Sequence, residues 1–251
     1  MRRFWLEDVI SEGQEIISLS GDILHHVRDV CRMVVGDRFE LLSPQKLAFF
    51  VELKDVSKKK AIAKILEVRS LPELKTPLIH LCLSIPKFAS FEAVIEKSVE
   101  LGVASIKPFF SDYSFVKSKA KINTSREVRW AKIVKNATQQ TGRGSLMPID
   151  SAIPLSELLK NFNQKPSKQG LFPYEGESAQ SVSEALQQWS QSPKEEIWLF
   201  VGSEGGFSFK EVQLFQEFGL LATTLGEQIL RVETACVALV SIIKYHENLW
   251  S

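Results

Sequence analysis

Residues 196–239 read EIWLFVGSEGGFSFKEVQLFQEFGLLATTLGEQILRVETACVAL. An apolar run opens this stretch, a glycine-rich turn follows at 201–208, and a helical segment comes next. A second apolar run at 220–226 then leads through another loop into another helix. Successive strand–loop–helix units predict parallel strands whose loops share one sheet edge, and α/β proteins bind their ligands at that edge.

The first loop is Val201-Gly202-Ser203-Glu204-Gly205-Gly206-Phe207-Ser208. Glycines at a strand-to-helix turn let backbone amides approach a ligand closely. The spacing matches neither a P-loop nor a dinucleotide fingerprint. Because Glu204 would repel a phosphate, a cationic or neutral ligand fits better, although a turn needed only for chain reversal is the alternative.

The second loop runs from Leu225 through Gly226 to Ala235. A helix is expected to begin near Glu233 or Thr234, with Thr234 as its cap and Glu233 at its positive end. The alternative interpretation makes Arg231 and Glu233 a surface ion pair.

Upstream, from residue 78 onward, apolar runs alternate with amphipathic segments. The pattern predicts a mainly parallel sheet covered by helices on both faces. Capping-box spacing marks three helix starts, and glycines mark three helix ends. The caps pair Thr124 with Glu127, Ser181 with Glu184 and Ser208 with Glu211, and the glycines are Gly102, Gly142 and Gly219.

Residues 1–70 are different in character. Segments 38–43, 47–56 and 60–69 are rich in β-branched and aromatic residues, which predicts a compact, barrel-like β domain. One helix is expected between Ser20 as cap and Gly36 as stop, with Ile23, Val27, Val30 and Val34 as its apolar stripe. The proline-containing stretch 70–77 is interpreted as the linker.

Composition narrows the class of protein. The chain has 251 residues, 44% hydrophobic and 24% charged, which is ordinary for a globular protein with a real core. No apolar run reaches about 18 residues, so no membrane span is expected. Cys31, Cys82 and Cys236 are isolated from one another and from histidines at ligand spacing, which predicts no metal and a reducing, cytoplasmic location.

Charge is distributed unevenly along the chain. The net charge is +1 over residues 1–70, +5 over 71–150 and −5 over 151–251, which favours a polyanionic partner at one face. A basic helix near 124–143 is able to track phosphates, with a solvated helix face as the alternative. The RNA-binding candidates of the basic segment from Lys107 to Arg143, which includes this helix, are Lys117, Arg129, Lys132, Gln140 and Arg143. Those of the first domain are Arg2, Arg3, His25, Arg28 and Arg32. His26 is expected to be half-buried.

The two loop motifs, VGSEGGFSFKEV and LGEQILRVETACVAL, together resemble the paired signature of the RsmE family. This family comprises the 16S ribosomal RNA (uracil-N3)-methyltransferases of the SPOUT superfamily. Further similar stretches run in order along the chain. They are RRFWL at 2–6, HHVRDVCRMVVGD at 25–37, PKFASFEAVIEKSVELGVASIKPFFS at 86–111 and RWAKIVKNATQQTGR at 129–143.

The resemblance implies an α/β architecture, with a PUA-like β-barrel domain at 1–71 and a SPOUT domain at 72–251 whose C-terminal part forms a trefoil knot. It also implies a homodimer that binds S-adenosyl-L-methionine in the knot and modifies ribosomal RNA of the small subunit. The cofactor residues that it implies are Leu171, Pro173, Gly202, Glu204, Gly205, Leu225, Gly226, Leu230, Arg231 and Thr234.

Four positions depart from the family pattern. Ser203 replaces a proline, Tyr113 an arginine, Gln228 an arginine and Val232 a threonine.

Methylation of uridine N3 requires loss of its proton, which leaves negative charge on the base. Arg231 is the candidate to stabilise that charge. Glu204 is either the base or a residue that only orders its loop. Two other functions remain open: a SPOUT methyltransferase of another RNA position or of tRNA, and a catalytically silent RNA-binding or ribosome-assembly protein.

Overall fold

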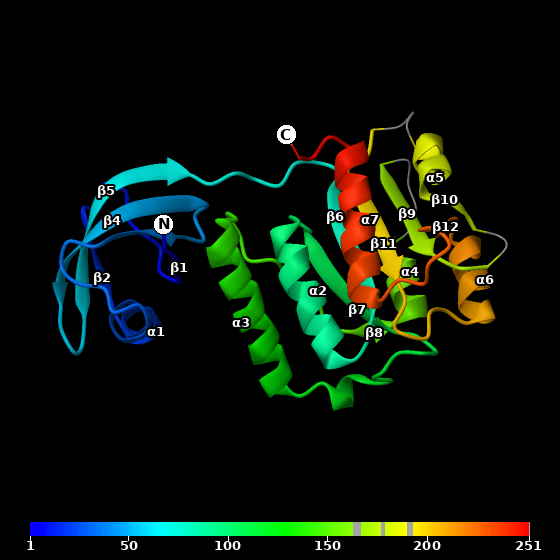
Figure 1. Ribbon diagram of the computed structural model, residues 1–251, viewed down its shortest axis with the longest axis horizontal. Coiled ribbons are helices and arrows are strands. Elements are labelled where there is room, and N and C mark those ends of the chain that lie inside the picture. Colours follow the sequence, from blue (N-terminus) through cyan, green and yellow to red (C-terminus); the bar gives the residue numbers. More distant parts are fainter. Residues whose placement is uncertain (163–166, 177–178, 190–192, 251) are drawn as a thin grey trace. The chain divides into compact units, whose positions relative to one another are not determined.

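The computed structural model describes residues 1–162, 167–176, 179–189 and 193–250 (Figure 1). The chain splits into two compact units. The first comprises Met1–Glu73 and Lys135–Leu146, and the second comprises Leu74–Val134 and Met147–Ser251. The predicted domain boundary after residue 71 stays a prediction. The grouping of residues 135–146 with the first unit was not anticipated from the sequence.

The first unit is built on a five-stranded sheet in the order β1-β3-β4-β5-β2. Strands β3, β4 and β5 coincide with the three predicted segments, whereas β1 and β2 are short and were not predicted. β1 pairs with β3 in parallel, and the other neighbours are antiparallel. The bounds are β1 Arg3–Trp5, β2 Ile16–Leu19, β3 Arg38–Leu42, β4 Leu47–Val56 and β5 Ala61–Ser70.

The predicted helix at 20–36 is shorter than expected. It comprises α1, Gly21–His25, and a π-helical turn η1, His26–Val30. Leu24 and Val27 are buried, but Val34 is 63% exposed, so the predicted stripe is wrong at its C-terminal end. The chain leaves the helix there because Arg32 adopts a positive φ of 51°.

Three further details of this region differ from expectation. Gly36, the expected helix stop, lies in a loop after the helix, and its backbone amide donates to the carbonyl of Leu53 at 2.8 Å. His26 is exposed and meets Phe4 edge-on, so the expectation that it is half-buried is wrong. Ser20 occupies the N-cap position of α1 without a side-chain hydrogen bond.

The second unit is built on a seven-stranded sheet in the order β10-β12-β9-β11-β6-β7-β8, and every described pair is parallel. The prediction of a mainly parallel sheet is confirmed. β9 lies between β11 and β12, which brings three strand ends to one edge. The bounds are β6 Leu78–Ser84, β7 Ser105–Phe110, β8 Ile153–Pro154, β9 Lys168–Pro173, β10 Gln180–Ser181, β11 Glu196–Val201 and β12 Leu221–Thr224.

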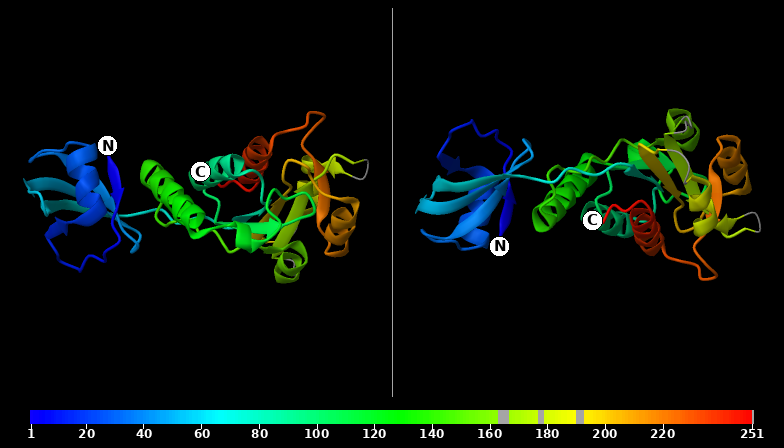
Figure 2. Two further views of the ribbon diagram at one scale, coloured as in Figure 1. Left: turned by 90° about the horizontal axis from the view of Figure 1, so that it is seen from below. Right: turned by 90° about the horizontal axis from the view of Figure 1, so that it is seen from above.

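Helices cover both faces of this sheet (Figure 2). On one face, α2 (Phe88–Glu100) lies beside α7 (Val232–His246), and the other face carries α4 (Leu155–Phe162) and α6 (Phe209–Glu217). Alternation along β11 explains the two layers, because Trp198 and Phe200 pack with Phe162 and Phe215 of α4 and α6. The remaining helices are η2 Lys119–Lys121, α3 Thr124–Thr141 and α5 Val182–Trp189. None of the described helices is long and apolar enough to cross a membrane.

Two of the three predicted capping boxes and all three predicted terminal glycines are present. The capping boxes at Ser208 and Ser181 are present. The predicted cap at Thr124 is wrong, because Asn123 accepts the amide of Arg126 at 3.0 Å and α3 begins one residue earlier than a Thr124 cap allows. The three predicted terminal glycines, Gly102, Gly142 and Gly219, have φ of 73°, 77° and 74°.

Candidate cofactor-binding site

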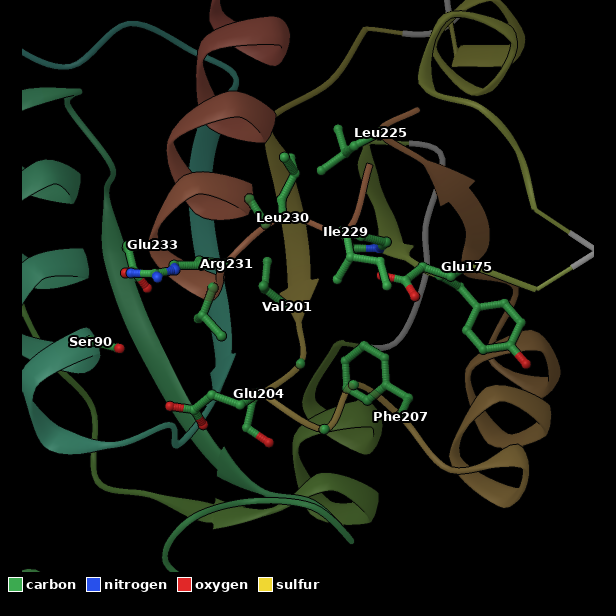
Figure 3. A pocket seen from close by; sticks show the side chains of 18 of the residues that line it. Ser90, Glu175, Val201, Glu204, Phe207, Leu225, Ile229, Leu230, Arg231 and Glu233 are labelled. Atoms are coloured by element: carbon green, nitrogen blue, oxygen red, sulfur yellow. The ribbon is translucent and has the colours of Figure 1, made fainter. Parts of the chain in front are cut away.

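The two loops predicted from the sequence meet at one cavity of about 660 Å³. The cavity lies at the carboxyl ends of β9, β11 and β12, where Pro173, Val201 and Thr224 end their strands. In Figure 3, Ser90, Glu204, Arg231 and Glu233 lie toward α2, on the opposite side from Leu225 and Ile229. Glu175 lies beside Ile229 in Figure 3, so charged groups line both sides of the cavity, and Leu225, Ile229 and Leu230 add apolar surface.

The first loop forms a tight turn that requires its glycines. The amide of Gly206 donates to the carbonyl of Ser203 at 2.9 Å, and Gly206 has φ of 67°. A Cβ on Gly202 would lie 2.9 Å from the Cα of Gly206. The Gly206–Ser203 hydrogen bond and the close approach of Gly202 to Gly206 both involve backbone atoms. A residue larger than glycine at position 202 would therefore open the turn.

A neighbouring loop, residues 111–117, supports this turn from outside the cavity. The hydroxyl of Ser203 donates to the carbonyl of Tyr113 at 2.7 Å, and Ser203 is 5% exposed. A Cβ on Gly205 would lie 2.8 Å from the Cβ of Tyr113. Ser203, one of the departures from the family pattern, thus provides a hydrogen bond for which proline has no donor.

Glu204 connects the turn to α2. Its carboxylate accepts the backbone amide of Lys87, the N-cap residue of α2, at 3.0 Å. A carboxylate at a helix N-terminus satisfies an otherwise unpaired N–H and interacts favourably with the helix dipole. Glu204 therefore orders its loop against α2 with one of its two oxygens.

The second loop presents open backbone groups to the cavity. Gly226 has φ of 114°, and the hydroxyl of Thr224 both accepts its amide at 3.2 Å and donates to its carbonyl at 3.1 Å. No hydrogen bond to another described residue occupies the N–H groups of residues 227–230. These amides are free to bind a polar ligand, while Leu225 and Leu230 line the cavity with apolar surface.

Helix α7 starts earlier than predicted. Arg231 is its N-cap residue, and Val232 is its first residue, so the expectation that Thr234 caps the helix is wrong. Arg231 is exposed and forms no ion pair with any residue that the structure describes, which excludes the surface pair with Glu233. Its guanidinium is thus available at the cavity wall.

Eight of the ten predicted cofactor residues line the cavity: Pro173, Gly202, Glu204, Gly205, Leu225, Gly226, Leu230 and Arg231. Leu171 is fully buried within β9, and Thr234 is exposed in the first turn of α7, so neither lines it. The binding roles of all ten stay predictions.

Sequence reasoning missed the contribution of α2, from which Lys87 and Ser90 line the cavity. The signal was available, because β6 is parallel to β11 and its following loop, 85–87, lies at the same sheet edge. Within the described part of the chain, no group of three or more His, Cys, Asp or Glu side chains is arranged to hold a metal ion.

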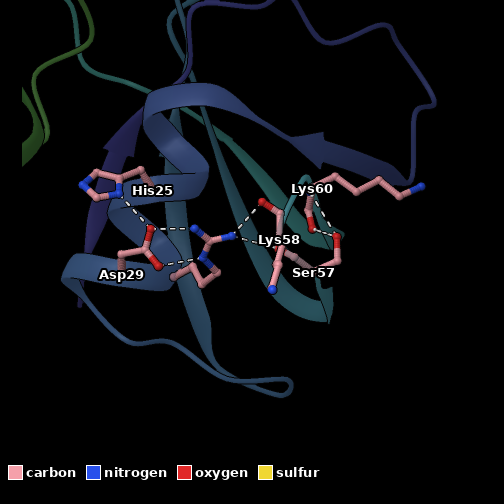
Figure 4. A network of polar contacts seen from close by, with 6 residues as sticks. His25, Asp29, Ser57, Lys58 and Lys60 are labelled. Atoms are coloured by element: carbon pink, nitrogen blue, oxygen red, sulfur yellow. Dashed lines mark hydrogen bonds and ion pairs between the residues drawn. The ribbon is translucent and has the colours of Figure 1, made fainter.

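In the first unit, the predicted RNA-binding residues are largely engaged in internal contacts. Arg28 forms two hydrogen bonds with the carboxylate of Asp29 and donates to the carbonyls of Ser57 and Lys58 (Figure 4). His25 shares the same carboxylate at 2.8 Å. Hydrogen bonds from Arg28 and His25 hold the pKa of Asp29 well below its usual range. This network fixes the turn that presents Lys58 and Lys60.

The other RNA-binding candidates of the first unit range from exposed to buried side chains. Arg2 donates to the carbonyl of Cys31 at 2.9 Å, and Arg32 is exposed. Arg3 donates to the carbonyl of Gln140 at 3.0 Å, and the side chain of Gln140 is exposed. Arg143 is only 9% exposed, and burial lowers its pKa to about 10, so the expectation that it lies on an accessible helix face is wrong.

Three candidates belong to the second unit. Arg129 forms a two-pronged pair with Glu92 at 2.7 and 2.8 Å. Lys117 donates to the carbonyls of Ser111 and Asp112, and Lys132 is exposed. Whether any predicted RNA residue contacts RNA stays a prediction.

Comparison with known proteins agrees with this geometry. Residues 72–244 match the family described as RNA methyltransferase domain, and residues 19–66 match RNA methyltransferase PUA domain. A ribosomal RNA small subunit methyltransferase E from Buchnera aphidicola (subspecies Acyrthosiphon pisum) is 32% identical over 96% of this chain and 92% of its own. The corresponding Bacillus subtilis protein is 30% identical over 99% and 98%.

Solved structures show the same relationship. The Neisseria gonorrhoeae ribosomal RNA small subunit methyltransferase E bound to S-adenosyl methionine has a TM-score of 0.83 and 30% identity, covering 98% of this chain and 97% of that one. A Legionella pneumophila putative methyltransferase in complex with the same cofactor has a TM-score of 0.84 and 27% identity, covering 97% and 96%. The chain therefore belongs to the ribosomal RNA small subunit methyltransferase E family, the RsmE family of its two loop motifs.

Proposed function

We propose that this protein transfers the methyl group of S-adenosyl-L-methionine to N3 of a uridine in small-subunit ribosomal RNA. One observation carries the proposal most directly: the two family motifs, 24 positions apart from Gly202 to Gly226, line one cavity at the carboxyl edge of the parallel sheet. The names of its relatives specify the RNA, and the uridine position follows from the family resemblance.

The cavity suits this cofactor in size and chemistry. Its volume of about 660 Å³ lies within the range of roughly 300–1,000 Å³ typical of small-molecule sites. The apolar surface of Leu225, Ile229 and Leu230 matches an adenine ring, and the free amides of 227–230 match its hydrogen-bonding edge or the ribose. Glu175, Glu204 and Glu233 line the cavity, which favours a cation over a phosphate. When bound, S-adenosylmethionine supplies an electrophilic methyl group.

In this proposal Arg231 stabilises the negative charge that develops on the uracil oxygens as N3 loses its proton. An exposed guanidinium with no described ion-pair partner is free to turn toward that charge, and its five donors suit delocalised oxygens. We assign Glu204 a positioning role, because its bond to Lys87 orders the loop. Holding the two reactants in line supplies much of the rate.

The proposal includes an assembly. We propose that the protein is cytoplasmic, that it acts as a homodimer and that its C-terminal part is threaded as a trefoil knot, as the family resemblance implies. Ile242 and Tyr245 on α7 are 38% and 80% exposed, and they supply apolar surface for a partner.

Primer extension on small-subunit ribosomal RNA from wild-type and deletion strains tests the function, because N3-methylation blocks base pairing and stops the polymerase. We expect a stop that disappears on deletion and returns when the purified protein and cofactor are added to the unmodified RNA. A stop that persists in the deletion strain overturns the uridine-N3 assignment. Absence of cofactor binding in calorimetry would indicate a silent RNA-binding protein.

A further inference from the structure

We propose that Tyr113 and Phe115 form a stacking platform for unpaired RNA bases next to the cofactor cavity. The inference rests on the proposed function for its substrate, and it assigns a role to the loop 111–117, in which Tyr113 departs from the family pattern. Single-stranded nucleic acid is commonly bound by exposed aromatic rings combined with nearby positive charge.

Both rings are exposed although they belong to a loop next to the core. Tyr113 is 52% and Phe115 is 53% exposed, whereas their neighbour Val116 is 2% exposed and packs in a core cluster with Ile85 and Ala152. Burying an aromatic ring is ordinarily favourable, so two exposed rings in one short loop indicate an interaction surface.

The loop that carries the rings is held rigidly. The hydroxyls of Ser84, Ser111 and Ser114 lie within 2.6–3.1 Å of one another, and all three are buried. The amide of Asp112 donates to Glu211 at 2.8 Å. The amide of Ser111 donates to the hydroxyl of Ser114 at 2.7 Å. A platform that is ordered before binding loses little entropy when a base stacks on it.

The platform is continuous with the cavity wall. Tyr113 packs against Gly205 of the first loop, which lines the cavity. Phe115 meets Phe88 edge-on at 5.7 Å, and Phe88 follows Lys87, another residue of the cavity wall. The guanidinium of Arg126 lies 3.9 Å from the centre of the Phe88 ring. A nucleotide on this platform would be adjacent to the cofactor cavity.

The surrounding charge favours a polyanion. Residues 113–126 contain Lys117, Lys119, Lys121 and Arg126 and no acidic residue. The carboxylate of Asp112, just before them, accepts a hydrogen bond from Ser208 at 2.5 Å. A second copy that met this surface with its own equivalent would oppose like charges, so RNA is the occupant that the chemistry favours.

Fluorescence titration of a uridine-rich oligoribonucleotide with a central 2-aminopurine tests the platform. We expect the wild-type protein to quench the single strand and to bind its duplex more weakly. Tyr113→Ala and Phe115→Ala should raise the Kd for the single strand by roughly tenfold. Tyr113→Phe keeps the ring and should stay within about twofold of the wild type.

Tyr113→Leu is the decisive variant, because it keeps apolar bulk against Gly205 but lacks an aromatic face. It should behave like Tyr113→Ala. Wild-type binding by Tyr113→Leu, or by both alanine variants, overturns the proposal. A change of oligomeric state in sedimentation with unchanged RNA binding also overturns it and assigns the surface to a second copy.

The titration measures RNA binding and requires no methyl transfer, so it can contradict the stacking platform without contradicting the proposed function. If the wild type binds the single strand through Tyr113 but methylates no ribosomal RNA, only the proposed function falls. If it methylates ribosomal RNA with the same KM in Tyr113→Ala, only the platform falls.

Discussion

The carboxylate of Glu204 accepts a hydrogen bond from the backbone amide of Lys87 at 3.0 Å, joining residues 117 positions apart in the chain. Through this bond the glycine turn after β11 is connected to the N-cap residue of α2, and both Glu204 and Lys87 line the cavity. The bond gives Glu204 a structural task that a glutamine can perform and an alanine cannot.

Glu204→Gln should therefore retain kcat within a few-fold, since the amide oxygen still accepts from Lys87. Glu204→Ala leaves that N–H unpaired and loosens the loop, and we expect cofactor affinity to fall by roughly tenfold, equivalent to about 1.4 kcal/mol. Calorimetry with S-adenosylmethionine and single-turnover methyl transfer measure the two effects. A loss of 10²-fold or more in kcat for the glutamine variant, on the order of a missing general base, would show that Glu204 is the base.

Arg231→Ala should reduce single-turnover methyl transfer on the order of 10²–10³-fold, the usual cost of losing one donor to a developing negative charge. Cofactor affinity should change little in comparison, because the negative charge develops on the uracil ring and not on the cofactor. Arg231→Lys, the matched control, keeps the charge without the planar guanidinium. Its methyl-transfer rate should lie between those of the wild type and Arg231→Ala. Near-normal turnover in the alanine variant would remove Arg231 from this role.

Gly226→Ala and Gly36→Ala form a matched pair, because both glycines have positive φ, 114° and 94°, and neither has an atom closer than 3.9 Å to an added Cβ. Each substitution should destabilise the fold by about 1–3 kcal/mol through backbone strain. Only Gly226→Ala should also weaken cofactor binding, since Gly36 lies in the other unit. Thermal unfolding and calorimetry separate these effects, and equal affinity in both variants would contradict the assigned site.

The buried carboxylate of Glu40 should make the free energy of unfolding sensitive to acid. It is 3% exposed and bound by Arg3 and Arg69 at 2.8 Å each. Burial raises its pKa, but hydrogen bonds from Arg69 and Arg3 outweigh this, so the net pKa lies below the ordinary 4.5. The stabilisation is thus present above about pH 4.5 and is lost as the pH falls through the folded-state pKa.

Glu40→Gln should lower the free energy of unfolding at neutral pH by about 1–3 kcal/mol. As the pH falls, the variant should lose less stability than the wild type does. Glu73→Gln, which removes an exposed pair with Lys46, should leave the pH profile almost unchanged. Urea unfolding between pH 7 and the acid limit of folding measures both. An identical acid slope in wild type and Glu40→Gln would show that Glu40 does not carry this dependence.

Local signals in the sequence predicted the elements well. The strands at 47–56 and 196–201, the capping box at Ser208 and the terminal glycine at 219 are all present. Each depends on side-chain periodicity or on backbone preferences within a few residues, which the sequence carries directly. The helix after Ser20 was predicted too long because one positive φ at Arg32 ended it, and Arg32 is not a residue type that signals such a turn.

The sequence by itself determined that two glycine-bearing loops follow parallel strands, and hence that they share one sheet edge. Only the tertiary structure decided that Glu204 binds Lys87, that Arg28 donates to the carbonyls of Ser57 and Lys58, and that Arg143 is buried. These outcomes depend on contacts between distant segments. Periodicity records which face of an element is apolar, but it holds no information on which distant group will satisfy a particular charge.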